Sequence, residues 1–128
     1  MGDQTRRGYE ILVEALRQQQ VEMAFFLMGG PLIDAANACL DAGIRIIDTR
    51  HEQAAAHMAG AWALLTGKPG VCSFTCGPGF TDAVTGIASA YMSCIPMLAI
   101  CGRSPFTEVD RTGIQDLDQI GIVRPITK

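Results

Sequence analysis

Two hydrophobic patterns alternate along this chain. Short runs of apolar, often β-branched or aromatic residues are separated by longer segments whose apolar positions recur every three or four residues. The first pattern is typical of buried strands and the second of helices that cover a core. We predict strands over residues 23–27, 44–48, 70–75 and 96–101, and helices over residues 6–19, 32–42, 52–65 and 81–91.

The order of these elements, a helix followed by repeated strand and helix pairs, predicts an α/β fold. We expect an open, mostly parallel, doubly wound sheet with helices on both faces. Three of the predicted strands end at Gly29-Gly30, at Asp48 to Glu52 and at Cys76 to Gly79. In such a sheet these strand ends share one edge, and ligands bind at that edge.

The sequence also predicts which helix faces are buried. The helix over 32–42 should bury Ile33, Ala36 and Leu40. The helix that begins at Glu52 carries no further charge up to residue 65, so most of its circumference should be buried. After residue 102 the pattern becomes irregular, with one short helix expected over 115–119. The apolar residues of this tail indicate docking on an apolar surface, and its end at Lys128 looks like a cut within a longer chain.

Composition narrows the class of protein. A chain of 128 residues that is 48% hydrophobic and 18% charged can form one packed domain, here residues 1–128. Its net charge of −3 offers no basic patch for nucleic acid. We find neither a membrane span nor a signal peptide, and therefore expect a cytoplasmic protein. The five cysteines lack a CxxC pair, so we interpret them as buried thiols, without a disulfide framework or a zinc site.

Glu52 is the strongest candidate for chemistry. It lies between a predicted buried strand and an apolar helix, where a carboxylate is costly to bury without a partner or a proton. Taken alone, Glu52 is more simply explained as an acid favoured by the helix dipole, with Asp48 or Thr49 as the N-cap. A zinc site is rejected, because His51 and His57 are six residues apart and would lie on opposite sides of a helix. No metal ligand is predicted in this chain.

The glycine-rich turns give weaker signals. Met28-Gly29-Gly30-Pro31 allows a close approach of backbone to a ligand. Gly77-Pro78-Gly79 resembles a phosphate cradle but lacks the lysine of a P-loop and the third glycine of a dinucleotide fingerprint. By itself, Gly77-Pro78-Gly79 is more simply a tight connection. His57 is interpreted as a structural histidine of the core.

Taken together, the motifs resemble one family. It is the amino-terminal, pyrimidine-binding domain of thiamine diphosphate-dependent enzymes of the acetolactate synthase, oxalyl-CoA decarboxylase and 2-hydroxyacyl-CoA lyase type. The resemblance covers the chain from about Gly8 to Lys128. Its most specific pieces are Arg50-His51-Glu52-Gln53-Ala54, Gly77-Pro78-Gly79, Thr85-Gly86-Ile87-Ala88-Ser89-Ala90-Tyr91, Ile95-Pro96 and Gly121-Ile122-Val123-Arg124-Pro125-Ile126-Thr127-Lys128.

The resemblance implies a role for Glu52 as the catalytic acid that hydrogen-bonds N1′ of the cofactor's aminopyrimidine. A proton shared with N1′ activates the cofactor, and a pocket of low dielectric raises the pKa of the acid toward what that sharing requires. The resemblance also implies cofactor contacts from Gly29, Gly30 and Pro31, and from Gly77, Pro78 and Gly79. Gln115 matches a glutamine that reaches toward substrate in acetolactate synthases.

The resemblance leaves the substrate open. The residues after Pro31 resemble the decarboxylases and lyases, whereas the tail resembles the synthases, so the substrate is a 2-oxo acid or an acyl-CoA that the sequence does not specify. Family members bind the cofactor's diphosphate through Mg²⁺ on a separate domain, which these 128 residues lack. We therefore expect half of an active site, either a fragment or one subunit of a split enzyme, that associates with a diphosphate-binding domain and with a second copy of itself.

Two other classes of function remain open from the sequence. A non-catalytic interaction domain could use the helix over 81–91 and the tail as a dimer surface. A flavodoxin-like nucleotide binder would use the turn at Gly77 to Gly79, but its phosphate motifs are incomplete. Glu52 discriminates among the three, because an interaction domain has no need of an acid at a buried strand end.

Overall fold

The computed structural model describes residues 5–107, 111 and 113–128. Within these residues the chain forms four strands, β1 (Met23–Phe26), β2 (Arg45–Asp48), β3 (Gly70–Phe74) and β4 (Met97–Cys101). The helices are α1 (Gly8–Gln18), α2 (Ile33–Asp41), α3 (Glu52–Thr66), α4 (Pro78–Met92) and α5 (Gln119–Val123), with 3₁₀ turns at Gly30–Leu32 and Arg124–Ile126. All four predicted strands are confirmed, each with ends within one residue of the prediction.

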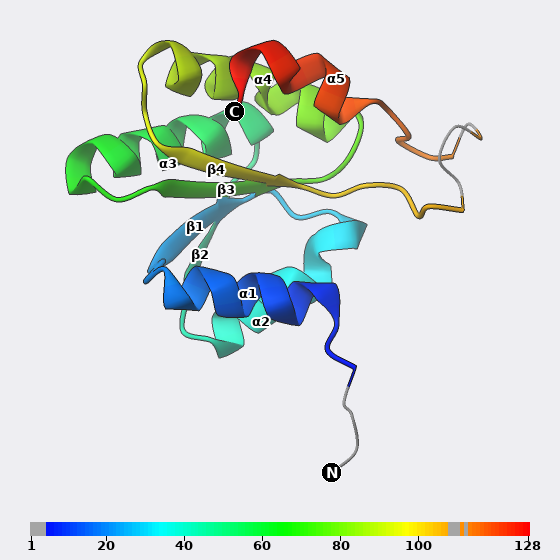
Figure 1. Cartoon of the computed structure of the whole chain (residues 1–128), viewed down its shortest axis with the longest axis horizontal. Coiled ribbons are helices and arrows are strands. Elements are labelled where there is room, and N and C mark those ends of the chain that lie inside the picture. Colours follow the sequence, from blue (N-terminus) through cyan, green and yellow to red (C-terminus); the bar gives the residue numbers. More distant parts are fainter. Residues whose placement is uncertain (1–4, 108–110, 112) are drawn as a thin grey trace.

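The four strands form one parallel sheet in the order β2-β1-β3-β4. The helices lie in two layers, with α1 and α2 on one face of the sheet and α3, α4 and α5 on the other (Figure 1). From β1 the chain passes through α2 to β2 at one edge of the sheet. It then crosses back through α3 to β3, on the other side of β1, and continues through α4 to β4. This is the doubly wound arrangement predicted from the sequence, and the ends of the central strands β1 and β3 mark the point where the winding reverses.

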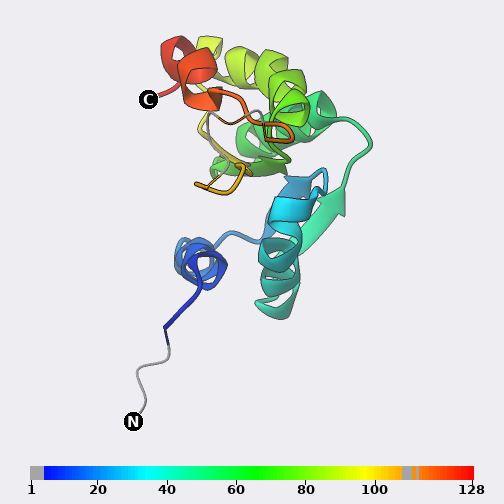
Figure 2. The same cartoon turned by 90° about the vertical axis from the view of Figure 1, so that its right-hand side faces the viewer.

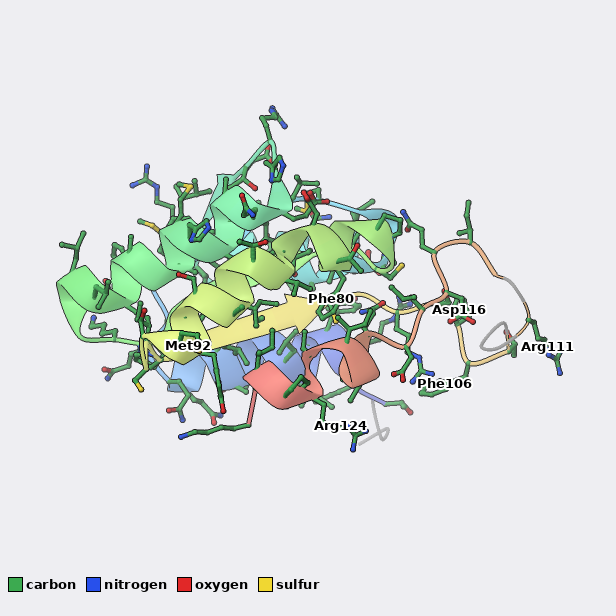
Figure 3. All side chains as sticks on the ribbon, turned by 90° about the horizontal axis from the view of Figure 1, so that it is seen from above. Phe80, Met92, Phe106, Arg111, Asp116 and Arg124 are labelled. Atoms are coloured by element: carbon green, nitrogen blue, oxygen red, sulfur yellow. The ribbon has the colours of Figure 1, made fainter. Side chains whose placement is uncertain are left out.

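Each face of the sheet carries its own hydrophobic core, because alternate strand residues point to opposite faces. Ala24 and Phe26 pack with α1 and α2, whereas Phe25 of the same strand packs with α3 and α4. Phe80 in the first turn of α4 is buried in the second core, and Figure 3 shows α4 lying between α3 and α5 above the sheet.

The burial of α3 differs from the prediction. Only one stripe of small residues is buried, formed by Ala55, Ala56, Ala59, Gly60 and Ala63. The outer face of the helix is open in this chain, with Leu64 69% and Leu65 86% exposed. The prediction of a helix buried on most of its circumference was therefore wrong for these residues, because one sheet and one neighbouring helix cover only part of it.

The helix α2 differs in the same way. Ala35, Ala36 and Cys39 face the sheet, whereas Ile33 and Leu40 are about half exposed, so the prediction for Ile33 and Leu40 was wrong. Small side chains let this helix approach the sheet closely. The larger residues beside them then point outward, although the helical period alone allowed either face.

The tail after β4 is irregular, as predicted, and projects beyond the sheet (Figures 1 and 3). Its last helical turns return to lie beside α4 (Figure 2). Residues 108–110 and 112 of this predicted irregular segment lie outside the described residues. The predicted helix over 115–119 is wrong, because Gln115 has a φ of 60° and the helix begins at Gln119, capped by the Asp118 side chain. Val123 is buried against α4, so the predicted docking of the tail is confirmed for this residue, although Ile114 and Ile120 are exposed.

Candidate functional site

Three loops meet at the carboxyl edge of the sheet. Gly29, after β1, lies so close to Thr75, after β3, that any side chain at position 29 would overlap Thr75. Gly102, after β4, lies against Pro31, where an added Cβ would be 2.9 Å from the proline Cβ. The predicted convergence of the glycine-rich turns at one edge is therefore present, and it depends on glycine at both contacts.

Glu52 is the first residue of α3 and is placed by the turn before it. Buried Thr49 joins β2 to β1, because its backbone N–H and its hydroxyl both donate to the Phe26 carbonyl, at 2.8 and 3.1 Å. His51 is the N-cap, and its Nδ1 accepts a hydrogen bond from the Gln53 N–H at 3.3 Å. The prediction of Asp48 or Thr49 as the cap was wrong: Thr49 fixes the strand end, and Asp48 pairs with Arg50.

The Glu52 carboxyl group lies against Gly79 in the first turn of α4. A Cβ added to Gly79 would be 2.7 Å from Oε1 of Glu52 and 2.6 Å from Cγ2 of Thr75. The predicted helix over 81–91 in fact begins at Pro78, because Gly77 has a φ of 62° that turns the chain and proline suits the first helical position. Pro78 and Gly79 are therefore helical residues rather than a loop.

Glu52 faces an open cavity of about 520 Å³. Its other lining residues are Pro78, Gly79, Thr81 and Asp82. A second cavity, of about 530 Å³, lies between α1 and α2 on the opposite face of the sheet and contains none of the predicted site residues. The cavity at Glu52 thus combines the strand-end position with a predicted catalytic acid.

The surroundings of Glu52 raise the pKa of its carboxyl group. Burial is the largest cause, and the neighbouring Asp82 carboxyl adds to it through a hydrogen bond and through charge repulsion. The backbone N–H of Glu52 and the His51 side chain act in the opposite direction. The net effect favours the protonated acid, which can donate a hydrogen bond.

The tail is hydrogen-bonded to the loop before α4 through Gln119. The Gly77 N–H donates to Oε1 of Gln119 at 3.2 Å, and Nε2 of Gln119 donates to the Gly102 carbonyl at 3.1 Å. Gln119 is only 6% exposed. Gln119 was not among the site residues predicted from the sequence. The available signal was its position among the apolar residues of the tail, because an amide buried there must be hydrogen-bonded.

The predicted site residues do not all share one pocket. Glu52, Pro78 and Gly79 line the cavity, and Gly77 adjoins it. Gln115 lies next to Gly77, where its side-chain oxygen accepts a hydrogen bond from the Cys76 thiol at 3.4 Å. Gly29, Gly30 and Pro31 lie at the neighbouring strand end. His57 is exposed, so its interpretation as a core histidine was wrong for this chain. Cys39, Cys72 and Cys76 are buried as predicted, whereas Cys94 is exposed.

Comparison with known proteins identifies the family of this chain. Residues 6–122 match the model of the thiamine pyrophosphate enzyme, N-terminal TPP binding domain. The chain belongs to this family. Family membership agrees with the resemblance drawn from the motifs and with the parallel α/β fold.

The similar proteins are large enzymes. The chain is 40% identical over 122 residues to a probable acetolactate synthase large subunit of Methanocaldococcus jannaschii, covering 95% of this chain and 21% of that protein. It is 44% identical to the acetolactate synthase large subunit of Buchnera aphidicola over 94% of this chain and 21% of that subunit. It is 41% identical to 2-hydroxyacyl-CoA lyase 2 of Danio rerio over 96% of this chain and 20% of that lyase. The chain therefore spans about a fifth of the length of these relatives. No helix among the described residues has the length and apolar character needed to cross a membrane.

Proposed function

We propose that this chain binds and activates the aminopyrimidine of thiamine diphosphate within an enzyme that makes or breaks a carbon–carbon bond beside a carbonyl. The substrate class is a 2-oxo acid or an acyl-CoA. The observation that carries the proposal is the position of Glu52, at the entrance of α3, facing an open cavity and resting against Gly79. Membership in a family of thiamine pyrophosphate-binding domains supports the choice of cofactor.

The residues at the cavity fit an aminopyrimidine. Such a ring needs a carboxyl group that shares a proton with a ring nitrogen, and Glu52 has a raised pKa and a face open to the cavity. Glycine at position 79 keeps this face accessible, because a Cβ there would meet Oε1 of Glu52. Pro78 and Thr81 supply weakly polar walls that do not compete for the proton.

In this proposal the chain's own residues hold and move one proton. Glu52 donates a hydrogen bond to N1′ of the aminopyrimidine, and the partly buried position strengthens that bond. Gly77, Pro78 and Gly79 border the ring, whereas Gly29, Gly30, Pro31 and Gln115 lie on the substrate side. When bound, the cofactor would supply the carbon nucleophile for chemistry at the substrate carbonyl.

The proposal requires partners that these residues do not provide. We infer that a diphosphate-binding domain or subunit holds Mg²⁺ and the cofactor's diphosphate, and that the active enzyme is a homo-oligomer. The apolar outer face of α3 supports a packing partner, since Leu64 and Leu65 are largely exposed in this chain. A non-catalytic dimerisation domain remains the alternative, but it would not need an acid with a raised pKa in an open cavity.

A chimera tests the proposal. The matching first fifth of the Methanocaldococcus jannaschii relative is replaced by this chain, and exchange of the C2 hydrogen of thiamine diphosphate for deuterium is measured with Mg²⁺. We expect accelerated exchange in the chimera and its loss in the Glu52→Gln variant, by about 100-fold or more, as for removal of a general acid. Glu10→Gln, a change on exposed α1, serves as the control and should leave the rate unchanged.

The outcomes separate the two functions. A Glu52→Gln chimera that keeps the exchange rate contradicts the catalytic role. A chimera that assembles normally but never accelerates exchange favours the non-catalytic alternative.

A further inference from the structure

Glu52 is not an isolated acid. One side-chain nitrogen or oxygen from each of His51, Glu52 and Asp82 lies within 4.8 Å of the others. His51 and Glu52 come from the entrance of α3, whereas Asp82 comes from the second turn of α4. The cluster therefore forms only because the two helices begin side by side.

The contacts within the cluster have an order. Oδ2 of Asp82 is 3.1 Å from Nδ1 of His51, and a carboxyl oxygen of Asp82 lies within 4.8 Å of a carboxyl oxygen of Glu52. Two carboxylates this close repel each other, which disfavours the ionised form. The nearby Asp82 carboxyl group thus favours a proton on Glu52.

His51 has competing contacts at Nδ1. This atom accepts the Gln53 N–H as the N-cap of α3, and it also lies beside the Asp82 carboxyl group. A histidine that caps the helix keeps Nδ1 free of a proton and is uncharged; only a protonated His51, which gives up this cap, opposes the effect of Asp82 on Glu52. Arg50, the nearest other cation in the turn, is paired with Asp48. Among the described residues, the ionisable groups that act on Glu52 are therefore Asp82 and His51.

We propose that Asp82 is a positioning residue that favours the protonated form of the Glu52 carboxyl group, with His51 opposing this effect when its ring is charged. Glu52 then meets the ring nitrogen of a bound aminopyrimidine as a hydrogen-bond donor. This inference rests on the proposed function but concerns the chain before any cofactor binds.

The test is a pH titration of the chain itself, without cofactor. The Glu52 side-chain carboxyl carbon is followed by ¹³C NMR in the wild type and in Asp82→Asn, which keeps the shape of the side chain and removes its charge. We expect the Glu52 midpoint to lie above the ordinary glutamate range in the wild type and to fall toward it in Asp82→Asn. His51→Asn keeps an acceptor for the helix cap but removes the ring that can take up a positive charge, and should move the midpoint upward.

Asp34→Asn is the matched control, because Asp34 is also an acid near a helix start but lies on the opposite face of the sheet. It should leave the Glu52 midpoint unchanged. Titration in the presence of EDTA excludes an adventitious cation as the cause of a shift. Equal Glu52 midpoints in the wild type and Asp82→Asn would overturn the proposal, as would an ordinary midpoint in the wild type.

The chimera supplies the second readout. Because Glu52 acts as a protonated donor, the Asp82→Asn chimera should lose activity at a lower pH than the wild-type chimera while keeping activity at acid pH. A structural role for Asp82 would lower activity at all pH values instead. Failure of the proposed function is seen separately, as an active Glu52→Gln chimera, and does not alter the NMR titration.

Discussion

The side-chain oxygen of Gln119 accepts a hydrogen bond from the backbone N–H of Gly77, and this 3.2 Å contact holds the loop before α4 to the start of α5. The same side chain donates from Nε2 to the Gly102 carbonyl at the end of β4. Gln119 thereby joins the tail, the last strand and the turn that positions Gly79 beside Glu52.

Gln119→Ala should destabilise the chain by about 1–3 kcal/mol, because it leaves the buried Gly77 N–H without its acceptor. Urea unfolding followed by circular dichroism measures this change. Gln18→Ala on exposed α1 is the control and should change the free energy of unfolding by about 0.5 kcal/mol or less. Equal effects of the two substitutions would mean that the Gln119 contact contributes nothing to stability.

Two glycines of the helix layer should respond to alanine in opposite directions. A Cβ at Gly86 of α4 would overlap the Cβ of Ala56 on α3, so Gly86→Ala should destabilise the chain by about 1–3 kcal/mol. A Cβ at Gly60 of α3 meets nothing within 4 Å, so Gly60→Ala should stabilise it by about 0.5–1 kcal/mol. Thermal unfolding of both variants decides the matter; a stabilising Gly86→Ala would contradict the close packing of α3 on α4.

Ser73 is the buried residue of β3 whose hydroxyl has no hydrogen-bond partner among the described residues. Removing an unpaired buried polar group relieves its desolvation cost, so Ser73→Ala should leave stability unchanged or raise it by about 1 kcal/mol. Ser104→Ala is the comparison, because the Ser104 hydroxyl donates to the Ile114 carbonyl at 3.2 Å and its loss should destabilise. Destabilisation by Ser73→Ala would indicate a partner that the chain acquires in solution, such as a buried water molecule.

Stability should fall with rising pH because of Glu52. The pKa of this group is raised in the folded chain above its ordinary value of 4.5, so the folded state binds more protons between 4.5 and the raised pKa. Above that window the wild type should be less stable than Glu52→Gln, and below pH 4.5 the two should be equal. Chemical unfolding at several pH values measures the difference.

Glu14 on α1 provides a contrast at acid pH. Hydrogen bonds from Arg17 and Gln18 lower the pKa of Glu14 to about 2, so its effect on stability is lost only as the pH falls from 4.5 toward 2. The two acids therefore act in separate windows. A Glu52→Gln variant that differs from the wild type only below pH 4.5 would contradict the raised pKa of Glu52.

Alkylation should distinguish the cysteines. Cys94 is exposed in the turn after α4, whereas burial raises the pKa of Cys72 to about 12 and also raises that of Cys39. Iodoacetamide should modify Cys94 within minutes in the folded chain and leave Cys72 and Cys39 unmodified until unfolding. Peptide mass spectrometry reads out each site. Early modification of Cys72 would mean that the sheet opens readily.

The sequence by itself determined the positions of the strands, their assembly into a parallel sheet and the location of Glu52 at a strand end. These features follow from local patterns, because a buried strand is marked by its apolar run and a strand-to-helix turn by its glycines. The motifs around Glu52 and Gly77 to Gly79 also pointed to the family that the comparison with known proteins then identified.

Only the tertiary structure decided which residues meet. The contact of Glu52 with Gly79, the approach of Asp82 to His51 and the buried position of Gln119 all join segments far apart in the chain. Periodicity predicts that a helix has a buried face, but the rotation and closeness of two helices depend on packing. Here the small residues Gly86 and Ala56 let α3 and α4 come together, and that approach brings the two carboxyl groups into one site.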